Sequence, residues 1–470
     1  MDEAVVVISD VHLGQGDDFD IFAGPGKLDM FRDFMKHTAA CAKSVEVVIN
    51  GDFIDFLQVK PWEIKVDRAA AGKKVEKIVD AHKAGVLRAL GELLSSPEHK
   101  LTILLGNHDV DLAFPEVWKH VADMILAAAG RPADGRLSFL ALDKTRVTYL
   151  RQVGGVTVHI EHGNEDDPYN GMNYADFFRD AERGTSDFHY PPGTQLVYEI
   201  MNGHKENYRF VDLLKPEVPA VPLLLLALEP GAVVDVPGIG LKSLAALGNG
   251  FVGWLRSKIS GPVLGRAGEP VSAEAADEDQ LSRDMAAAYQ DEHAATSGVT
   301  DADALLFARY FESTEEEPAA EVPVLRPSFA GAKKRLARAA VGCLGRPLGL
   351  RDRAYYQCDH PEREDVKWAR KRLQGDVKVV VFGHTHRPLK AEFDDGRVYL
   401  NSGAWANQIT LPGPQDDIEA WMGRIRCNDE SNRTAFPTYI TLFPNGSGVT
   451  AMLNLWDGKE ETLWQKNIPA

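Results

Sequence analysis

Cysteine is scarce in this sequence. The 470 residues include four cysteines, and no two of them are close enough to form a Cys-x-x-Cys pair: they are Cys41, Cys343, Cys358 and Cys427. A disulfide framework needs a dense set of cysteines, and a zinc ribbon needs closely paired ones. The sequence therefore argues against both kinds of scaffold and predicts a protein of a reducing compartment.

Long apolar runs are also missing. The apolar run within residues 219–228 is roughly half the length that spans a bilayer, and it contains Pro222. Met1, Asp2 and Glu3 lead almost directly into the run Val5–Ile8, without the basic region and long apolar region of a signal peptide. We therefore expect a cytoplasmic protein without a transmembrane helix.

Positive charge is in short supply as well. The formal net charge is −17 at pH 7, whereas general affinity for nucleic acid needs a concentration of Lys and Arg. Any anionic substrate must therefore meet local positive charge or bound metal. The chain is also long for one domain, and 44% of its residues are hydrophobic, which is ample for a packed core with a substantial second part.

The most informative stretch lies near the C-terminal end of the sequence. Val380–Phe382 is predicted to be a buried strand, and Gly383 ends it just before His384 and His386. Two histidines at positions i and i+2 can ligate a metal, although one such pair is a weak signal by itself. The signal gains weight because four other stretches repeat the same pattern of a buried strand followed by metal-capable residues.

These four stretches occur earlier in the chain. The predicted strands are 4–8, 45–49, 101–105 and 156–161. The residues that follow them are, in order, Asp10 with His12, Asp52, Asn107 with His108 and Asp109, and His162. Carboxylate, amide and imidazole groups are all metal ligands, and an imidazole beside a carboxylate can also transfer protons. We excluded Asp55 from the site because its position favours a cap or a supporting role.

The remaining pattern predicts helices over residues 28–42, 74–94 and 115–129. Short strands are predicted near residues 137–142 and 146–150, and His159 is expected to be structural. A hairpin of residues 438–443 and 448–455 is predicted to turn at Asn445 and Gly446.

Taken together, the five stretches resemble the calcineurin-like metallophosphoesterase family, all five of whose motifs are present. The resemblance covers about residues 4–165 and 377–456. It implies an α/β fold with two packed mixed β-sheets flanked by helices. It also implies two divalent cations, one held by Asp10, His12, Asp52 and His386 (site A) and one by Asp52, Asn107, His162 and His384 (site B). His108 would be the catalytic imidazole and Asp109 its orienting partner.

The chemistry of this ligand set is consistent with the resemblance. Oxygen and nitrogen ligands without cysteine suit Mn²⁺ first, with Fe²⁺ and Zn²⁺ as alternatives. A hydroxide that bridges two such cations can attack phosphorus at neutral pH, while His108 assists the leaving group. We therefore predict a metal-dependent hydrolase of a phosphoric ester or a pyrophosphate bond.

The interval between the fourth and fifth motifs is far longer than an ordinary loop. We predict a core of residues 1–165 and 377–470 and a large, mainly helical cap over residues 166–376. Residues 163–170 could reach the substrate or form a polar turn. The apolar segment 241–259 and the basic segment 326–353 fit an ordinary packed lid and a solvated face best. The alternative is a cap for a bulky or lipid-linked substrate that also contacts an anionic membrane.

Several functions fit this sequence. The alternatives to a lipid-linked substrate are a soluble nucleotide phosphodiesterase, a nuclease or a phosphoprotein phosphatase, and the net charge makes the nuclease the weakest of them. A phosphate-binding protein without turnover is a further alternative, but it would not need both His108 and Asp109. The sequence determines neither the substrate nor the oligomeric state.

Overall fold

The computed structural model describes one compact unit, which is built from residues on both sides of Val218–Leu350. The described residues are 1–24, 26–62, 66–130, 135–140, 147–183, 188, 190–206, 208–215, 358, 359, 361, 363–410, 418–427, 429 and 433–470. The apolar segment 219–259, the acidic stretches of the insert and the basic segment 326–353 lie outside them. The predicted limits of the cap stay a prediction.

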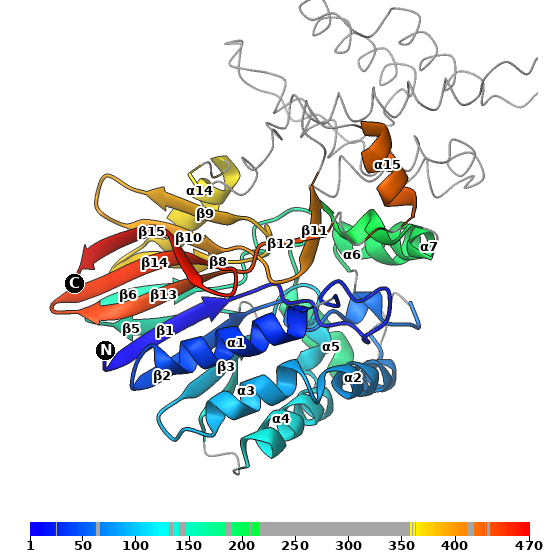
Figure 1. Ribbon diagram of the computed structural model, residues 1–470, viewed down its shortest axis with the longest axis horizontal. Coiled ribbons are helices and arrows are strands. Elements are labelled where there is room, and N and C mark those ends of the chain that lie inside the picture. The colour runs from blue at the N-terminus through cyan, green and yellow to red at the C-terminus, as the bar shows by residue number, and fades with distance from the viewer. Residues whose placement is uncertain are drawn as a thin grey trace, which may run out of the picture. The chain divides into compact units, whose positions relative to one another are not determined.

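A seven-stranded mixed sheet forms one layer (Figure 1). Its order is β15-β14-β13-β1-β2-β3-β4, with β1 to β4 parallel and β13 antiparallel to β1. The strands are β1 (Glu3–Ile8), β2 (Ser44–Asn50), β3 (Lys100–Leu104), β4 (Leu137–Leu140), β13 (Thr438–Asn445), β14 (Gly448–Trp456) and β15 (Glu460–Pro469). The predicted hairpin is thus present as β13 and β14, and a third antiparallel strand extends it.

A five-stranded mixed sheet forms the second layer, in the order β5-β6-β8-β10-β9. Within it, β6, β8 and β10 are parallel. The strands are β5 (Tyr149–Val153), β6 (Val156–Ile160), β8 (Val377–Phe382), β9 (Pro388–Glu392) and β10 (Val398–Ser402). A small additional sheet contains β7 (Leu214–Lys215), β11 (Asn407–Thr410) and β12 (Arg433–Ala435).

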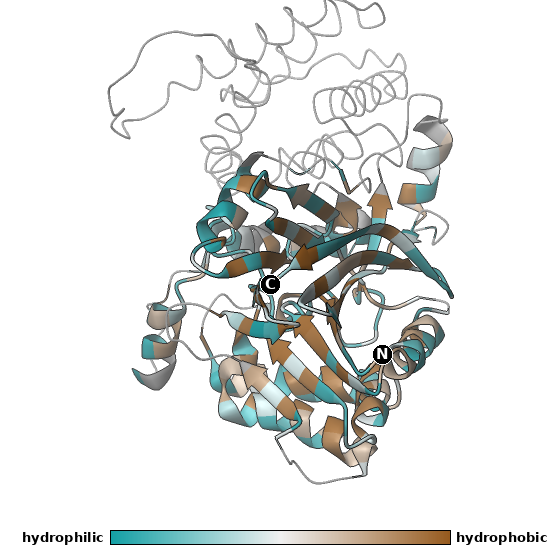
Figure 2. Ribbon diagram, turned by 90° about the vertical axis from the view of Figure 1, so that its left-hand side faces the viewer, coloured by the Kyte–Doolittle hydropathy of each residue, from teal (hydrophilic) through white to brown (hydrophobic). Residues whose placement is uncertain are grey.

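The core lies between the two main sheets. One continuous cluster of buried apolar side chains includes Val7 and Leu442 from the first sheet and Val158, Val379 and Leu400 from the second. These strands form the brown, hydrophobic interior in Figure 2. The expected fold of two mixed sheets flanked by helices is therefore confirmed.

Helices cover the outer faces of both sheets. In Figure 1, α1 (Lys27–Ala40), α3 (Val86–Leu94) and α4 (Pro115–Ala129) lie along the first sheet, beside α2 (Arg68–His82). On the second sheet, Ala369 of α14 (Arg363–Arg372) packs with Val380 and Tyr399. The shorter elements are η1 (Phe56–Gln58), η2 (Val110–Ala113), α5 (Tyr174–Arg183), α6 (Pro192–Leu196), η3 (Val197–Met201), α7 (Asn202–Lys205), η4 (Arg209–Asp212) and α15 (Ile418–Arg426). No helix within these described ranges is long and apolar enough to cross a membrane.

The helix predicted over residues 74–94 is two helices in the structure. α2 ends at His82 and α3 begins at Val86, because Gly85 has φ −111° and ψ −109°, which lie outside the helical region. A Cβ atom at Gly85 would lie only 2.8 Å from Cδ1 of Leu28 on α1. Periodicity within one segment could not reveal this break, since part of its cause is a contact with another helix.

Lys27, the first residue of α1, is a buried cation. Its side chain belongs to a residue that is only 4% exposed, and Nζ has no hydrogen-bond partner among the described residues. The amino terminus of a helix also disfavours positive charge. Burial lowers the pKa of Lys27 from 10.5 to about 7. Its Nζ lies 5.5 Å from the centre of the Phe22 ring, a contact that favours the charged form only weakly.

We expect Lys27→Met to raise the free energy of unfolding by a few kcal/mol at pH 6. The unfolded chain keeps the proton up to about pH 10.5, whereas the folded chain loses it above about pH 7. The destabilisation is therefore complete below pH 7 and fades as the pH rises towards 10.5. Urea unfolding at pH 6, 7.5 and 9 measures this. Lys36→Met on the same helix, where the side chain is 66% exposed, should change little at any pH. A gain for Lys27→Met that did not shrink with pH would contradict the buried charge.

Candidate metal centre

The predicted site residues follow the carboxyl ends of parallel strands from both sheets. Asp10 and His12 follow β1, Asp52 follows β2, and His162 and His386 follow β6 and β8. Parallel strands present these ends at one edge of a sheet, where ligands bind in open α/β folds. Two groups of predicted ligands result, Asp10 with His12 and His386, and Asp10 with Asp52 and His162, and within each group the donor atoms lie within 4.8 Å of one another. A third group of possible ligands combines His12 with Asp55 and His108.

The shortest distances lie around the two aspartates. Asp10 Oδ1 is 3.2 Å from His386 Nε2 and 3.8 Å from His12 Nε2. Asp52 Oδ2 is 3.2 Å from His162 Nε2 and 3.6 Å from His12 Nε2. Five of the seven predicted ligands therefore meet in one place, where Asp10 belongs to both groups and Asp52 also approaches His12 of the first group.

The other two predicted ligands border this cluster. The ring of His384 lies 5.4 Å from that of His162, centre to centre, and its Nε2 is 2.9 Å from Asp167 Oδ2. Asn107 is buried directly after Gly106, where a Cβ atom would lie 2.2 Å from Asp52 Oδ1. The glycine therefore allows this loop to approach Asp52, because any side chain at residue 106 would collide with the carboxylate.

Buried polar atoms at the site lack ordinary partners, which fits a cation centre. Asp10 Oδ1, Asn107 Oδ1 and His162 Nε2 are all buried without a hydrogen-bond partner in the part of the chain that the structure describes. Leaving such groups without a partner costs about 1–3 kcal/mol each. Carboxylate oxygen, amide oxygen and imidazole nitrogen are ligands that suit divalent transition metals, so the residues present fit such ions.

The backbone is strained at the same place. The non-glycine residues with positive φ in the described ranges are Asp10, His12, Asp52, His384 and His386, with φ between 50° and 66°. Each residue in this left-handed region costs roughly 1–2 kcal/mol. Strain of this kind clusters at functional sites, where the surrounding fold holds it. All five residues are predicted metal ligands, and this concentration is independent of the side-chain distances.

In two of the predicted ligand histidines, the ring nitrogen Nδ1 is hydrogen-bonded to an oxygen atom. His12 Nδ1 is 2.9 Å from Asp55 Oδ2, and His162 Nδ1 is 2.8 Å from the carbonyl oxygen of Asn50. Because these oxygens accept a hydrogen bond, each ring carries its proton on Nδ1 and turns Nε2 towards the aspartates. Such contacts fix the orientation and the tautomer of a metal-binding histidine.

The partner of His108 is Asp55 in this structure, and not Asp109. His108 Nδ1 lies 3.1 Å from Asp55 Oδ2. Asp109 instead accepts hydrogen bonds from the backbone N–H groups of Gly106 at 2.6 Å and Phe53 at 2.8 Å. Asp109 therefore holds together the loops after β2 and β3. The assignment from sequence order fails because the Asp109 carboxylate is already engaged with backbone amides.

The sequence predicts that Asp55 has a capping or supporting role outside the site. The structure shows the cap and also a contact with the site. Asp55 Oδ1 accepts from the N–H groups of Leu57 and Gln58 at the start of η1. Its Oδ2 also meets His12, His108 and the side-chain amide of Gln58. The signal that pointed to it was an aspartate three residues after Asp52, at the point where the chain turns back.

The carboxylates favour positive charge throughout the site. Burial lowers the pKa of His108, but the charges of Asp55 and Asp52 and the hydrogen bond to Asp55 outweigh burial and raise it above its ordinary value. Burial likewise lowers the pKa of His162, and the charge of Asp52 raises it to about 10. Protons and metal cations compete for such a site, so metal affinity should fall as the pH is lowered.

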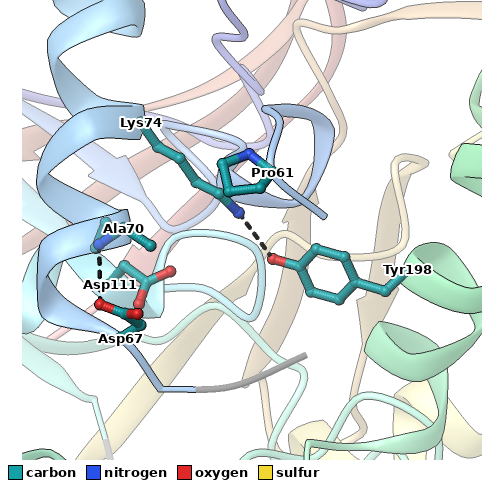
Figure 3. A pocket seen from close by; sticks show the side chains of 7 residues that line it. Pro61, Asp67, Ala70, Lys74, Asp111 and Tyr198 are labelled. Atoms are coloured by element: carbon teal, nitrogen blue, oxygen red, sulfur yellow. Dashed lines mark hydrogen bonds between the residues drawn. The ribbon is translucent and has the colours of Figure 1, made fainter. Parts of the chain in front are cut away.

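A small pocket is lined by residues of α2, η2 and η3 (Figure 3). Its lining includes Lys74 of α2 and Tyr198 of η3. Lys74 Nζ donates to the Tyr198 hydroxyl at 3.3 Å and to the carbonyl oxygen of Phe56 at 3.1 Å. The N–H of Phe56 donates to the carbonyl oxygen of His108. Lys74 thus helps to hold the backbone between Asp55 and the His108 loop.

We expect Asp55→Asn to lower kcat by about 10–100-fold, the usual cost of removing a group that orients an active-site ligand. Asn at this position can still cap η1, but it carries no negative charge for His12 and His108. Asp109→Asn should act mainly on stability, since it weakens two backbone hydrogen bonds. Steady-state kinetics and urea unfolding of both variants test this. A larger kinetic loss for Asp109→Asn than for Asp55→Asn would restore the assignment made from sequence order.

Comparison with known proteins finds a family model that matches part of the chain. Residues 4–222 match the sequence model of the calcineurin-like phosphoesterases. Among solved structures, the chain is similar to wild-type Vps29 complexed with Zn²⁺ from Entamoeba histolytica, with 21% identity, a TM-score of 0.15 and coverage of 23% of this chain and 47% of the other. Vps29 from Cryptosporidium parvum has 19% identity, a TM-score of 0.16 and coverage of 23% and 46%. The chain thus spans about half the length of these relatives.

A dimetal phosphatase from Danio rerio is similar over 99% of this chain and 98% of its own, with 9% identity and a TM-score of 0.30. No curated protein matches the chain.

Proposed function

We propose that this chain, whose residues 4–222 match the calcineurin-like phosphoesterase model, uses two divalent cations to hydrolyse a phosphoric ester or pyrophosphate bond. The observation that carries the proposal is the convergence of Asp10, His12, Asp52, His162 and His386 next to His108. A buried cluster of ligand atoms and an imidazole paired with a carboxylate together provide the groups that phosphoryl transfer needs.

Each residue has a distinct task in this proposal. Asp10, His12, Asp52 and His386 would hold the cation of site A, and Asp52, Asn107, His162 and His384 that of site B. When bound, the two cations would polarise the phosphoryl oxygens and lower the pKa of water. Asp52 would be shared between them, because its Oδ2 faces both His12 and His162.

His108 would supply the proton that the leaving group needs. Its side chain is 22% exposed, so a substrate can reach it, whereas the Asp55 side chain beside it is 2% exposed. Burial lowers the pKa of its imidazole, but the charges of Asp55 and Asp52 outweigh burial and favour the protonated form. Asp55 holds Nδ1 and leaves Nε2 to donate a proton to the departing oxygen.

The proposal extends to the identity of the metal and the class of substrate. The ligand set favours Mn²⁺, with Fe²⁺ and Zn²⁺ as alternatives. The composition of the insert is consistent with a bulky or lipid-linked substrate and peripheral contact with an anionic membrane, but the segments concerned are outside the described residues. A soluble nucleotide phosphodiesterase, a nuclease and a phosphoprotein phosphatase are the competing activities, and a phosphate-binding protein is the non-catalytic alternative.

A hydrolysis panel tests the proposal. The protein would be stripped of metal with a chelator and dialysed, and Mn²⁺, Fe²⁺ or Zn²⁺ would be returned separately. The substrates are an alkyl phosphomonoester, a phosphodiester, a lipid-linked nucleoside diphosphate sugar, a phosphopeptide and single-stranded DNA. We expect turnover that depends on added metal and is greatest with Mn²⁺. If the protein bound two cations and hydrolysed none of the five, the phosphate-binding alternative would replace the enzyme.

A further inference from the structure

Asp167 lies in the loop after β6, which sequence patterning left open as a substrate contact or a polar turn. In the structure its Oδ2 is 2.9 Å from Nε2 of His384, and the exposed fractions of the two side chains are 17% and 11%. The contact joins residues 217 positions apart in the chain. None of the five sequence motifs includes Asp167, yet it touches a predicted ligand of site B.

The loop holds the Asp167 carboxylate in a defined place. Oδ1 accepts from the backbone N–H of Tyr169, and Oδ2 accepts from the side-chain amide of Asn170, both at 2.8 Å. The carbonyl oxygen of Asp167 also accepts from the N–H of Gly171 at 2.7 Å. An aspartate that closes its own turn in this way has few alternative rotamers, so its second oxygen is directed at His384.

The neighbouring residue anchors the same loop to α14. Asp166 contacts Lys371 at 2.5 Å and Arg372 at 2.6 Å. The Arg372 side chain is 5% exposed, and it also pairs with buried Glu161. The loop is therefore tied to a rigid element on one side and to the Asp167 turn on the other, which suits a precise contact with His384.

The contact of His384 with a fixed oxygen resembles the contacts of two other predicted ligand histidines. His12 and His162 each give one ring nitrogen to a fixed oxygen and turn the other towards the aspartates. In His384 the nitrogen given to an oxygen is Nε2, so the nitrogen that remains for a cation is Nδ1. A carboxylate is a stronger acceptor than a carbonyl oxygen, and it raises the basicity of the imidazole that it holds.

We propose that Asp167 is a positioning residue for site B, which holds the Nε2–H of His384 and so presents Nδ1 as a metal ligand. The inference rests on the proposed two-cation function and extends it to a residue outside the motifs. If Asp167 served only to close the turn through Tyr169 and Asn170, its replacement would affect the loop and leave metal affinity unchanged.

Asp167→Asn separates these two roles. The amide oxygen can still accept from the N–H of Tyr169, so the backbone turn is kept, and asparagine is a common residue in such turns. The contact with the Asn170 side chain is lost, and Asn170→Ala controls for that loss. At residue 167 the amide nitrogen then faces His384 Nε2 and donates to it, which forces the ring proton onto Nδ1. The matched control is Asp176→Asn, which removes the same charge from a partly exposed side chain of α5 that pairs with Arg179 and does not touch His384.

The measurement is Mn²⁺ binding by equilibrium dialysis with elemental analysis, together with electron paramagnetic resonance. We expect Asp167→Asn to weaken one of two ions by about 10–100-fold and to replace the signal of a spin-coupled pair with that of isolated Mn²⁺. Asp176→Asn should bind both ions like the parent. The double variant with His384→Ala and Asp167→Asn should bind metal no more weakly than His384→Ala alone, since both substitutions remove the same interaction.

Two results would overturn the inference: parental binding of both ions by Asp167→Asn, or losses that add in full with His384→Ala. A parent protein that bound no pair of cations would overturn the proposed function instead. Because the assay needs no substrate, the two failures are distinguishable.

Discussion

Asp52→Asn protein should bind neither cation and should lose hydrolysis by about 10³-fold or more, because several kcal/mol of transition-state stabilisation depend on the metals. Asp52 Oδ2 lies between His12 Nε2 and His162 Nε2, and so reaches both groups of ligands. Its Oδ1 accepts from the backbone N–H of His108 at 2.9 Å. Asparagine can keep this second contact, but its amide group removes the shared negative charge.

The appropriate comparison is His12→Ala, which should chiefly weaken site A and leave one ion bound. Asp17→Asn, a change to a loop carboxylate that accepts from the N–H of Phe19, is the control for loss of one negative charge. Elemental analysis after dialysis against limiting metal gives the stoichiometry of all three. Two ions per chain in purified Asp52→Asn would refute the shared role of this carboxylate.

His108→Ala should retain both metals and lose kcat by about 10²–10⁴-fold, the range for a general acid or base. His108 contacts Asp55, and the proposed ligand set does not include it. The substrate must have a poor leaving group, because a nitrophenolate departs without a proton and would hide the effect. His120→Ala, a change to an exposed residue on α4, is the control and should leave kcat unchanged.

The pH profile gives a second test of this role. His108 donates a proton only while it is protonated, so kcat should decline as the pH rises above its raised pKa. His108→Ala should lack that decline. If the variant lost its metals along with its activity, His108 would be a ligand, and its assignment as the proton donor would fail.

The local pattern was sufficient to single out residues that the structure brings together. A run of apolar residues followed by glycine and a polar group can be recognised in a short stretch of sequence, as in Val380–His386. The carboxyl ends of parallel strands meet at one edge, so residues that follow such strands are brought together without knowledge of the loops. Five predicted ligands meet for this reason, and the two sheets themselves follow from the same strands.

Tertiary structure decided which carboxylates serve those ligands. Asp109 directly follows His108 in the sequence and was the expected partner, whereas only the turn of η1 directs Asp55 at the rings of His12 and His108. Asp109 is held away by the backbone amides of Phe53 and Gly106. A hydrogen bond depends on the distance and the angle between donor and acceptor, and the order of residues in the sequence specifies neither.

The sequence by itself therefore determined the strands, the strand ends and the identities of the residues that meet there, because these depend on periodicity and on short-range turns, whereas the two mixed sheets were expected from the resemblance to a known family. The helix break at Gly85, where a side chain would collide with Leu28, depends on packing between separate helices. The contact of Asp167 with His384 depends on loops from different strands that lie 217 residues apart. Such contacts have no local signature, since each is set by where the whole fold places two distant segments.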